Sequence, residues 1–270
     1  MAAPRAVVTG SPAAPPRVGL VVSANTPTST DNRWEGGIVY DPETGQLGYR
    51  TDDCEPGETD RDLPVRGPVE WDAYVVGDGI RCSTFGINAR DWRAQVRRQL
   101  EAVAEFQISS ELWSGSLAAE HNYPNLALTD GGEAIGTGNQ DPIDSLALLE
   151  QYLAEQGGQR GMIHAPRSLV TVWTAYGMVV RDGGLLLTIH DTIVVPGVGY
   201  DAADGEAVAT GMVEVRRGEV VITGDPTTDA VSVDRETNTV EVRAEQMALA
   251  SWDGRAHGRV AVDLPDPATT

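Results

Sequence analysis

Lysine is absent from this 270-residue chain, and all 20 of its basic residues are arginine. The absence excludes every mechanism in which the chain itself would supply an ε-amine: a Schiff base, a phosphate-loop lysine, a lysine general base, or an isopeptide cross-link through lysine. A GC-rich genome, which favours arginine codons, accounts for the absence without functional selection. The exclusion holds under either explanation.

Cysteine is almost as scarce, because Cys54 and Cys82 are the only two. Two cysteines are too few for the disulfide framework of a small secreted domain or for a four-cysteine zinc site. We interpret them as two reduced thiols, with a bridge between neighbouring loops as the alternative.

Long apolar runs are also missing. No segment approaches the roughly 18 apolar residues that a membrane span needs. Residues 1–22 contain scattered proline and glycine, where a signal peptide would have a continuous apolar core of about 7 to 15 residues. We therefore expect a soluble protein that is intracellular when made and has no membrane partner.

Positive charge is in the minority. The 20 arginines stand against 40 acidic residues, for a formal net charge of −20. A protein that holds nucleic acid by neutralising its phosphates needs clustered lysine and arginine. The charge therefore argues against a DNA-binding regulator.

Catalytic and metal-binding motifs are missing as well. The sequence has no His-Glu-x-x-His, no Cys-x-x-Cys and no Gly-x-Ser-x-Gly. Residues 131–138 are rich in glycine but lack the Lys-Ser/Thr pair of a phosphate loop. A solvated acidic loop or, less favoured, a calcium site is the interpretation for Asp52, Asp53, Asp60 and Asp62. We predict a protein that is not an enzyme and has neither cofactor nor metal site.

Proline and acidic residues concentrate near the beginning of the chain. Residues 1–87 hold nine of the sixteen prolines, and residues 51–72 hold eight acidic residues against two arginines. Such stretches are usually functional, linkers, or arms that fold on a neighbour. The stretch also carries Trp34, Tyr40 and Tyr49, which need a surface to lie on. We expect it to gain its order on sister copies of the chain and not in a core of its own.

Two regular patterns follow. Residues 69–85 are strand-like on both sides of Gly77-Asp78-Gly79, which predicts a hairpin with its turn there. Residues 88–114 contain neither proline nor glycine. Their apolar side chains recur at steps of three and four, which predicts one α-helix about 40 Å long. These apolar residues are Trp92, Val96, Leu100, Val103 and Phe106.

The middle of the chain predicts helices, and the rest predicts strands. Asp141-Pro142 supplies an N-cap and a proline at the first helical position, with Leu146, Leu149 and Leu153 as the apolar stripe. A buried strand is predicted over 162–165 and a second helix from Pro166 to Gly177. Further strands are predicted over 178–180, 185–189, 192–195, 211–215, 219–222, 231–233, 239–242 and 259–264. This order indicates an α+β fold.

Several of these segments resemble a known fold. Tyr74 to Gly86 running into Arg90 to Trp113 resembles the join of an extended hairpin to a spine helix. Leu146 to Leu153, Met162 to Pro166, Leu169 to Tyr176 and Leu187 to Gly197 resemble an axial domain. Val240 to Glu245 and Ala256 to Val262 resemble closing strands of a peripheral domain. Together they resemble tailed-bacteriophage major capsid proteins, whose Hong Kong ninety-seven type coat fold is shared with encapsulins.

The resemblance implies an α+β phage coat-protein fold with the following parts. They are an N-terminal arm (1–45), an extended loop or hairpin (46–87), a peripheral domain with the spine helix (88–135), an axial domain (136–228), and return strands of the peripheral domain (229–270).

It also implies a function. The chain would be a structural head protein that self-assembles through pentamers and hexamers into an icosahedral shell around double-stranded DNA. It would assemble in the host bacterial cytoplasm, reside in the virion, and contact the packaged DNA non-specifically. Scaffolding, portal or decoration proteins would be separate chains, and the missing lysine excludes a lysine-to-asparagine chain-mail. The implied inter-subunit contacts are Trp34, Tyr40, Tyr49, Trp71, Arg90, Arg93, Arg97 and Arg98.

Other readings remain open. An encapsulin-like cargo shell would have the same fold around a protein cargo. A tail-tube or connector subunit would be another virion part, and an enzyme of unknown class is the last alternative.

Overall fold

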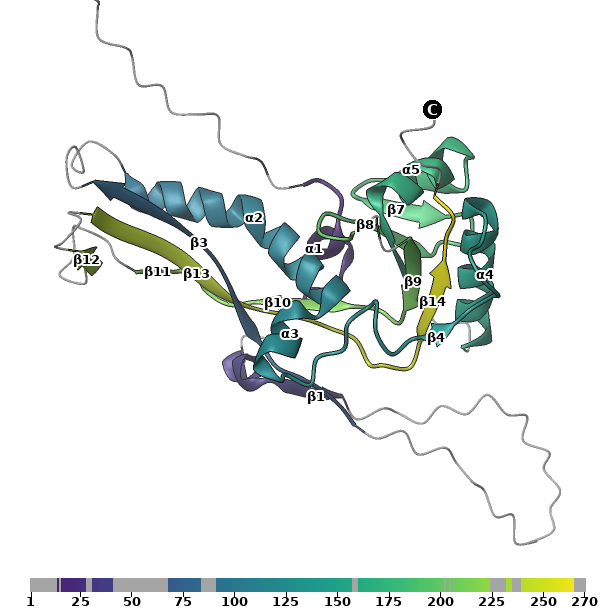
Figure 1. Cartoon of the computed structure of the whole chain (residues 1–270), viewed down its shortest axis with the longest axis horizontal. Coiled ribbons are helices and arrows are strands. Elements are labelled where there is room, and N and C mark those ends of the chain that lie inside the picture. The colour runs from purple at the N-terminus through teal and green to yellow at the C-terminus, as the bar shows by residue number, and fades with distance from the viewer. Residues whose placement is uncertain are drawn as a thin grey trace, which may run out of the picture.

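The computed structural model describes residues 14, 16–27, 31–40, 68–83, 91–156, 160–201, 203, 205–223, 232–234 and 239–264. A long helix, α2, lies beside a narrow sheet at one end of the molecule, and a larger sheet with two covering helices forms the other end (Figure 1). A small ladder of two short strands flanks the narrow sheet.

The long helix predicted over 88–114 is confirmed as α2, Trp92–Ser114. It begins where the Asp91 side chain accepts a hydrogen bond from the Ala94 N–H at 3.0 Å, a regular N-cap. It ends at Gly115, whose φ of 62° is the left-handed conformation that favours glycine. The apolar stripe of Val96, Leu100 and Ile108 is fully buried, so α2 supplies one wall of a core.

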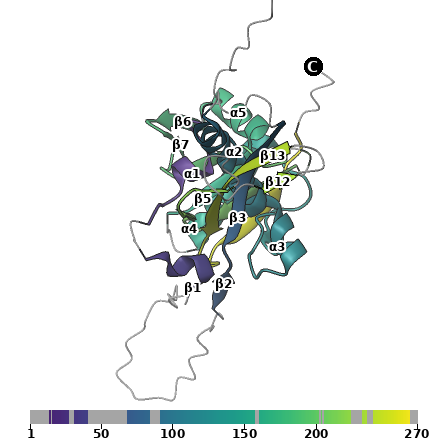
Figure 2. The ribbon, with the colours of Figure 1, turned by 90° about the vertical axis from the view of Figure 1, so that its left-hand side faces the viewer.

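The narrow sheet is built around one long strand, β13, Thr239–Ser251. The strand β3, Tyr74–Ser83, pairs with it antiparallel over ten residues, from Thr239↔Ser83 to Ala248↔Tyr74. Along its other edge β13 pairs in turn with β12, Ser232–Asp234, β11, Val221–Thr223, and β10, Glu214–Arg217. The two ribbon views together show α2 alongside β3 and β13 (Figure 2).

The hairpin turn predicted at Gly77-Asp78-Gly79 is wrong. These residues lie inside β3, opposite Arg243 to Glu245 of β13. A Cβ added at Gly77 would lie 3.3 Å from the Ala244 carbonyl oxygen. The glycines therefore serve the close approach of two strands, which is the other meaning of glycine inside a strand.

The larger sheet has seven strands in the order β4-β14-β9-β5-β8-β7-β6. Its central pair β5 and β8 is parallel, whereas β5 with β9, β9 with β14, β8 with β7 and β7 with β6 are antiparallel. The strands are β4 (Glu133–Ala134), β5 (Met162–Pro166), β6 (Val179–Asp182), β7 (Leu185–Thr188), β8 (Ile193–Gly197), β9 (Glu206–Thr210) and β14 (His257–Ala261).

Helices α4, Pro142–Glu155, and α5, Arg167–Ala175, pack on one face of this sheet and confirm the predicted helices. The second core lies between them and the strands; Leu149, Leu169 and Trp173 are fully buried in it. The Trp173 indole N–H donates to the Pro142 carbonyl at 2.6 Å, which ties α5 to the first turn of α4.

The described parts of the N-terminal stretch pack on their own molecule, which corrects the expectation that this stretch has no core. They are α1 (Leu20–Ser23), the 3-10 turn η1 (Asn32–Gly36), and β1 (Ile38–Tyr40), which pairs with β2 (Val69–Trp71). Leu20 is 0% and Trp34 7% exposed, both in the core that α2 lines. Local irregularity did not prevent burial, because a few large apolar side chains suffice to hold a segment on a preformed surface.

The domain boundaries stay predictions, and the sheets group the strands differently from them. Strands β10 and β11 fall inside 136–228 yet pair with β13. Strand β14 falls inside 229–270 yet lies in the larger sheet. The chain therefore passes between the two sheets more often than a simple order of domains implies.

Candidate assembly surface

No metal centre emerges from the described residues. Nowhere among them do three histidine, cysteine, aspartate or glutamate side chains gather as metal ligands would. The same part of the chain contains no helix long and apolar enough to cross a membrane. The acidic residues Asp52, Asp53, Asp60 and Asp62, like the Cys54 and Cys82 side chains, lie outside what the structure describes.

The two cores meet at a buried polar junction. His164 of β5 lies with Nδ1 2.9 Å from the Tyr200 hydroxyl and Nε2 3.0 Å from the Thr210 hydroxyl. Thr210 donates its own proton to the Gly211 carbonyl at 2.8 Å, so it accepts from Nε2–H, and Nδ1 accepts from Tyr200. Burial lowers the pKa of His164 to about 3. Tyr200 stacks on Trp113 at 4.5 Å, which couples the larger sheet to the end of α2.

A buried carboxylate on α2 holds the N-terminal segment. Both oxygens of Glu105 accept the Val21 N–H, at 3.2 and 3.1 Å. Burial raises the pKa of Glu105, and the backbone N–H groups of α1 act against that rise. A Cβ added at Gly19 would lie 2.4 Å from the carboxylate, so only glycine allows this approach. Asn25 adds a second attachment, accepting from the Val215 N–H at 2.9 Å.

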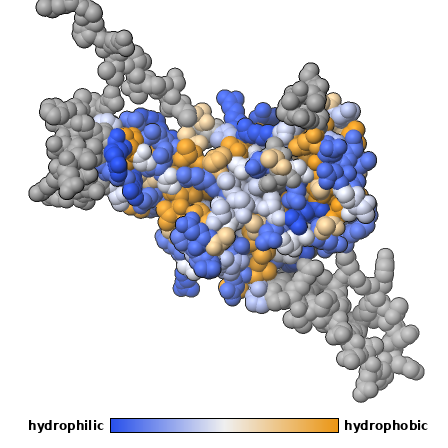
Figure 3. Space-filling model, viewed as in Figure 1, coloured by the Kyte–Doolittle hydropathy of each residue, from blue (hydrophilic) through white to orange (hydrophobic). Residues whose placement is uncertain are grey.

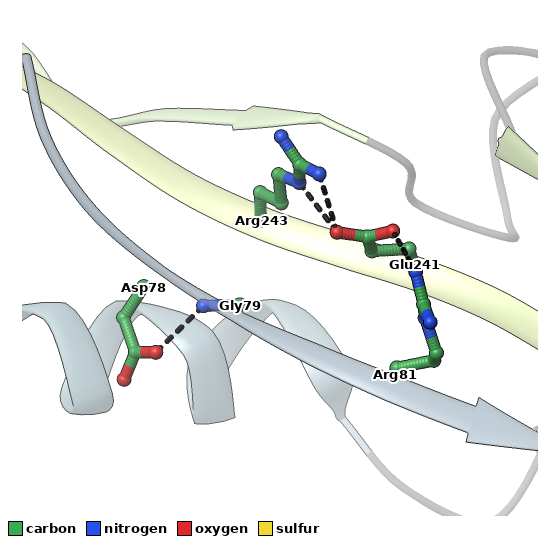
Figure 4. Close-up of polar contacts among 5 residues, drawn as sticks. All are labelled: Asp78, Gly79, Arg81, Glu241 and Arg243. Atoms are coloured by element: carbon green, nitrogen blue, oxygen red, sulfur yellow. Dashed lines mark hydrogen bonds and ion pairs between the residues drawn. The ribbon is translucent and has the colours of Figure 1, made fainter.

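The face of the narrow sheet turned away from α2 is charged. Alternate residues of β13 point to opposite faces: Val242 and Ala244 are fully buried toward α2, whereas Glu241 and Arg243 lie outward. Glu241 forms ion pairs with Arg243 at 2.6 Å and with Arg81 of β3 at 3.4 Å (Figure 4). The hydrogen bond from Arg243 lowers the pKa of Glu241. Exposed pairs of this kind contribute little to stability, so this face is suited to solvent or to a partner.

The first turns of α2 carry a second charged surface. Arg93, Arg97 and Arg98 are exposed there. An open groove of about 520 Å³ is lined by Asp91, Arg93, Ala94 and Arg97 at the start of α2 and by Val220 and Ile222, which precede and belong to β11. We call this surface the arginine groove.

Apolar side chains are also exposed. On the face drawn in Figure 3 they form separate patches among hydrophilic residues. A groove of about 800 Å³ lies between α4 and the β7–β8 turn, where Ile189 is 75% exposed. Other exposed apolar residues are Val22, Val39, Val75, Phe106, Ile143, Tyr176, Val180 and Val221.

The predicted contact residues fall into four groups. Trp34 and Trp71 are 7% and 1% exposed and belong to the chain's own core, which leaves little of either side chain for a neighbour to contact. The indole N–H of Trp71 donates to the Trp252 carbonyl at 3.1 Å. Tyr40 is half-buried, with its hydroxyl 3.2 Å from that of Ser251. Tyr49 and Arg90 lie outside the described residues, and Arg93, Arg97 and Arg98 are exposed.

The sequence analysis did not single out the buried Glu105 or the surface ion pairs of Glu241 with Arg243 and Arg81. The alternation of Glu241, Arg243 and Glu245 with small apolar residues was a usable sign of a one-sided strand. Their pairing with Arg81, 160 residues away, was not visible.

We compared the chain with known protein families, curated proteins and solved structures. No protein-family model and no curated protein matches the sequence. The capsid of a native GTA particle matches with a TM-score of 0.57 and 11% identity, over 97% of this chain and 95% of that chain. Gordonia phage Cozz matches with a TM-score of 0.54 and 13% identity, over 97% and 92%.

A third match is the holo-SrpI encapsulin of Synechococcus elongatus, with a TM-score of 0.51 and 14% identity, over 74% of this chain and 78% of that chain. The chain therefore has the fold that phage capsid proteins of the Hong Kong ninety-seven type share with encapsulins. The resemblance predicted from the sequence is confirmed at the level of the fold.

Proposed function

We propose that this chain is a structural protein that forms a closed shell from many copies of itself. The observation that supports this proposal most directly is the likeness in fold to the capsid of a GTA particle over nearly the whole of both chains. The more specific proposal is a major capsid protein of a tailed phage, with an icosahedral shell around double-stranded DNA. Because it is a proposal about assembly, it assigns no catalytic role.

The shape and charge of the molecule support this proposal. An elongated chain with a narrow sheet at one end offers long edges to neighbours, and large repeated interfaces can offset the entropy of ordering extended segments. The net charge of −20 is compatible with a shell that contacts DNA non-specifically and does not condense it.

We propose further that residues 1–13 and 41–67 make contacts between copies. Each adjoins an anchored element of the chain: α1 is held by Glu105, and β1 and β2 are paired. Anchoring at the base would give each segment a defined starting point on the subunit surface.

Expression of the chain alone tests the proposal. We expect closed particles by size exclusion and negative-stain microscopy, because the interfaces are formed between identical subunits. Tubes or open rings would favour a tail-tube or connector subunit instead. A chain that stays monomeric at high concentration and turns over a substrate saturably would contradict the proposal.

The likeness in fold to an encapsulin supports a second candidate function, a shell around a protein cargo. The two candidates differ in their contents. Particles purified from the native source would carry nuclease-protected DNA in the first case and a stoichiometric cargo protein in the second.

A further inference from the structure

We propose that Gln107 of α2 and Asp78 of β3 close the outer edge of β3 to pairing with a strand of a second copy of this chain. The contact is autoinhibitory, because it occupies within one molecule the backbone groups that strand pairing between molecules would use. The inference goes beyond the proposed function, since it concerns the single subunit and holds whether or not the copies form a shell.

The strand β3 is an edge strand among the described residues. It pairs with β13 over ten residues along one side. Strands β10, β11 and β12 pair with the other side of β13, and within the described part of the chain no strand pairs with the outer side of β3. A long edge strand presents a row of unpaired N–H and C=O groups, which is a template for pairing with another chain. The outer edge of β3 is such a template unless other groups of the molecule occupy it.

The backbone groups that point outward belong to alternate residues. In an antiparallel ladder, every second residue directs its N–H and C=O away from the partner strand. Both backbone groups of Gly77 meet the Gln107 side chain, so Gly77 is one of these residues. A step of two along the strand adds Gly79. Both glycines lie near the middle of β3, so extensive pairing along this edge must use their backbone groups.

Gln107 occupies the edge at Gly77. Its Oε1 atom accepts from the Gly77 N–H at 3.1 Å, and its Nε2 atom donates to the Gly77 carbonyl at 2.8 Å. These are the two hydrogen bonds that a residue of a pairing strand would form with Gly77. The helix fixes the position of this amide, because Ala104 and Ile108 are buried in the core that α2 lines.

Asp78 occupies the edge at Gly79. Its Oδ1 atom accepts from the Gly79 N–H at 2.7 Å (Figure 4). The carboxylate also adds a negative charge that opposes pairing of two β3 strands. When Gly77 of one strand lies opposite Gly79 of the other, the two Asp78 residues lie opposite each other, and like charges in that position destabilise a strand pair.

A second β3 is the partner that these contacts exclude. Every copy carries the same edge, and antiparallel pairing of two identical edges is an isologous two-fold contact. The glycines leave the middle of the strand without side chains, and glycine-rich strands are prone to slipped or alternative pairings. Closing the edge leaves the copies free to meet through other surfaces.

A synthetic peptide of residues 74–83, carrying Cys82→Ser to prevent oxidation, tests the contact because it offers β3 without the rest of a second copy. Fluorescence anisotropy measures its binding to the full chain. The double variant Gln107→Ala/Asp78→Ala should bind the peptide on the order of tenfold more tightly than the wild-type chain, because three backbone groups are freed to pair. Infrared spectra of the peptide with isotope-labelled carbonyls should then show it in a β-sheet.

Two control variants separate edge pairing from a general loss of stability. Gln99→Ala makes the same substitution on α2, at a side chain whose Oε1 atom has no hydrogen-bond partner within the described residues. Leu20→Ala weakens the core without altering the edge of β3. Both variants should bind the peptide as weakly as the wild-type chain does.

Equal binding of the peptide by the wild-type chain and by the double variant would overturn the inference, as would an equal gain of binding in Leu20→Ala. If the double variant does not fold, Asp78→Ala alone carries the test, because Asp78 lies outside both cores. No gain of binding in that variant would then contradict the inference. None of these results requires the wild-type chain to form shells, so failure of the proposed function leaves the test intact.

Discussion

His164 is a titratable side chain in a fully buried position, and its surroundings decide what it does. Both ring nitrogens are hydrogen-bonded to hydroxyls, and the ring stays neutral because a charged imidazolium would lose its hydration there. The sequence did not reveal that this residue joins the larger sheet to α2 through Tyr200 and Trp113.

We predict that His164 makes the protein less stable in acid. Its pKa is about 3 when folded and near 6.5 when unfolded, so between these pH values the unfolded chain binds a proton that the folded chain does not. The free energy of unfolding should fall by about 1.4 kcal/mol for each unit of pH decrease across that window.

Urea denaturation at several pH values measures this slope. The variant His164→Gln keeps a donor and an acceptor without a titrating ring, and should lose the contribution. The exposed His190→Gln is the matched control and should keep the wild-type slope. Equal slopes for wild type and His164→Gln would contradict the prediction.

At the scale of elements, the long helix was readable from the sequence because its apolar stripe is local, whereas several strands were misjudged, β9 and β13 among them. Strand β9, Glu206–Thr210, was not predicted, since its Ala-Val-Ala centre has little β propensity. The predicted strand over 239–242 in fact runs to Ser251 through a similar run of alanines. Small side chains are required there because α2 packs directly on Ala244 and Ala248, which are fully buried. Tertiary packing overrode propensity.

One side chain of α2, that of Gln107, forms hydrogen bonds with backbone groups of β3 that point away from β13. Gln107 accepts from the Gly77 N–H at 3.1 Å and donates to the Gly77 carbonyl at 2.8 Å. In an antiparallel pair the N–H and C=O groups of alternate residues point away from the partner strand. Gln107 therefore replaces the next strand at that point.

We predict that Gln107→Leu lowers the free energy of unfolding by about 1–3 kcal/mol, because both groups of Gly77 lose their partner. Gln99→Leu is the matched control on the same helix. The Oε1 atom of Gln99 is buried and has no hydrogen-bond partner within the described residues, so its removal should be neutral or stabilising. Denaturation midpoints of the two variants give the comparison, and similar effects would refute the assignment.

For the molecule as a whole, the N-terminal stretch has two roles, packing in the chain's own core and assembly, and the sequence analysis expected only the second. Leu20 and Trp34 are part of the chain's own core, and Glu105 attaches α1 to the middle of α2. Residues 1–13 precede this attachment and contain no acidic residue. Assembly and folding should therefore respond to different parts of the stretch.

We predict that deleting residues 1–13 leaves the unfolding temperature unchanged and prevents the formation of complete particles. Leu20→Ala should instead lower the free energy of unfolding by about 2–5 kcal/mol, as expected for a fully buried leucine. Thermal melts and negative-stain micrographs of both variants distinguish the two roles. Normal particles from the truncated chain would show that the segment is dispensable for assembly.

Composition and periodicity alone determined the α+β class, the long helix, the two helices of the larger sheet and the order of parts that resembles a capsid protein. These properties are local, since a repeat of three and four residues or a proline after an N-cap acts within a few turns. Only the tertiary structure decided which strands pair with β13, that Trp34 and Trp71 are buried, and that Arg81 forms an ion pair with Glu241. Each of these depends on which residues come into contact although they are far apart in the chain. Strand pairing and burial are set by such long-range contacts and not by a residue's neighbours in the sequence.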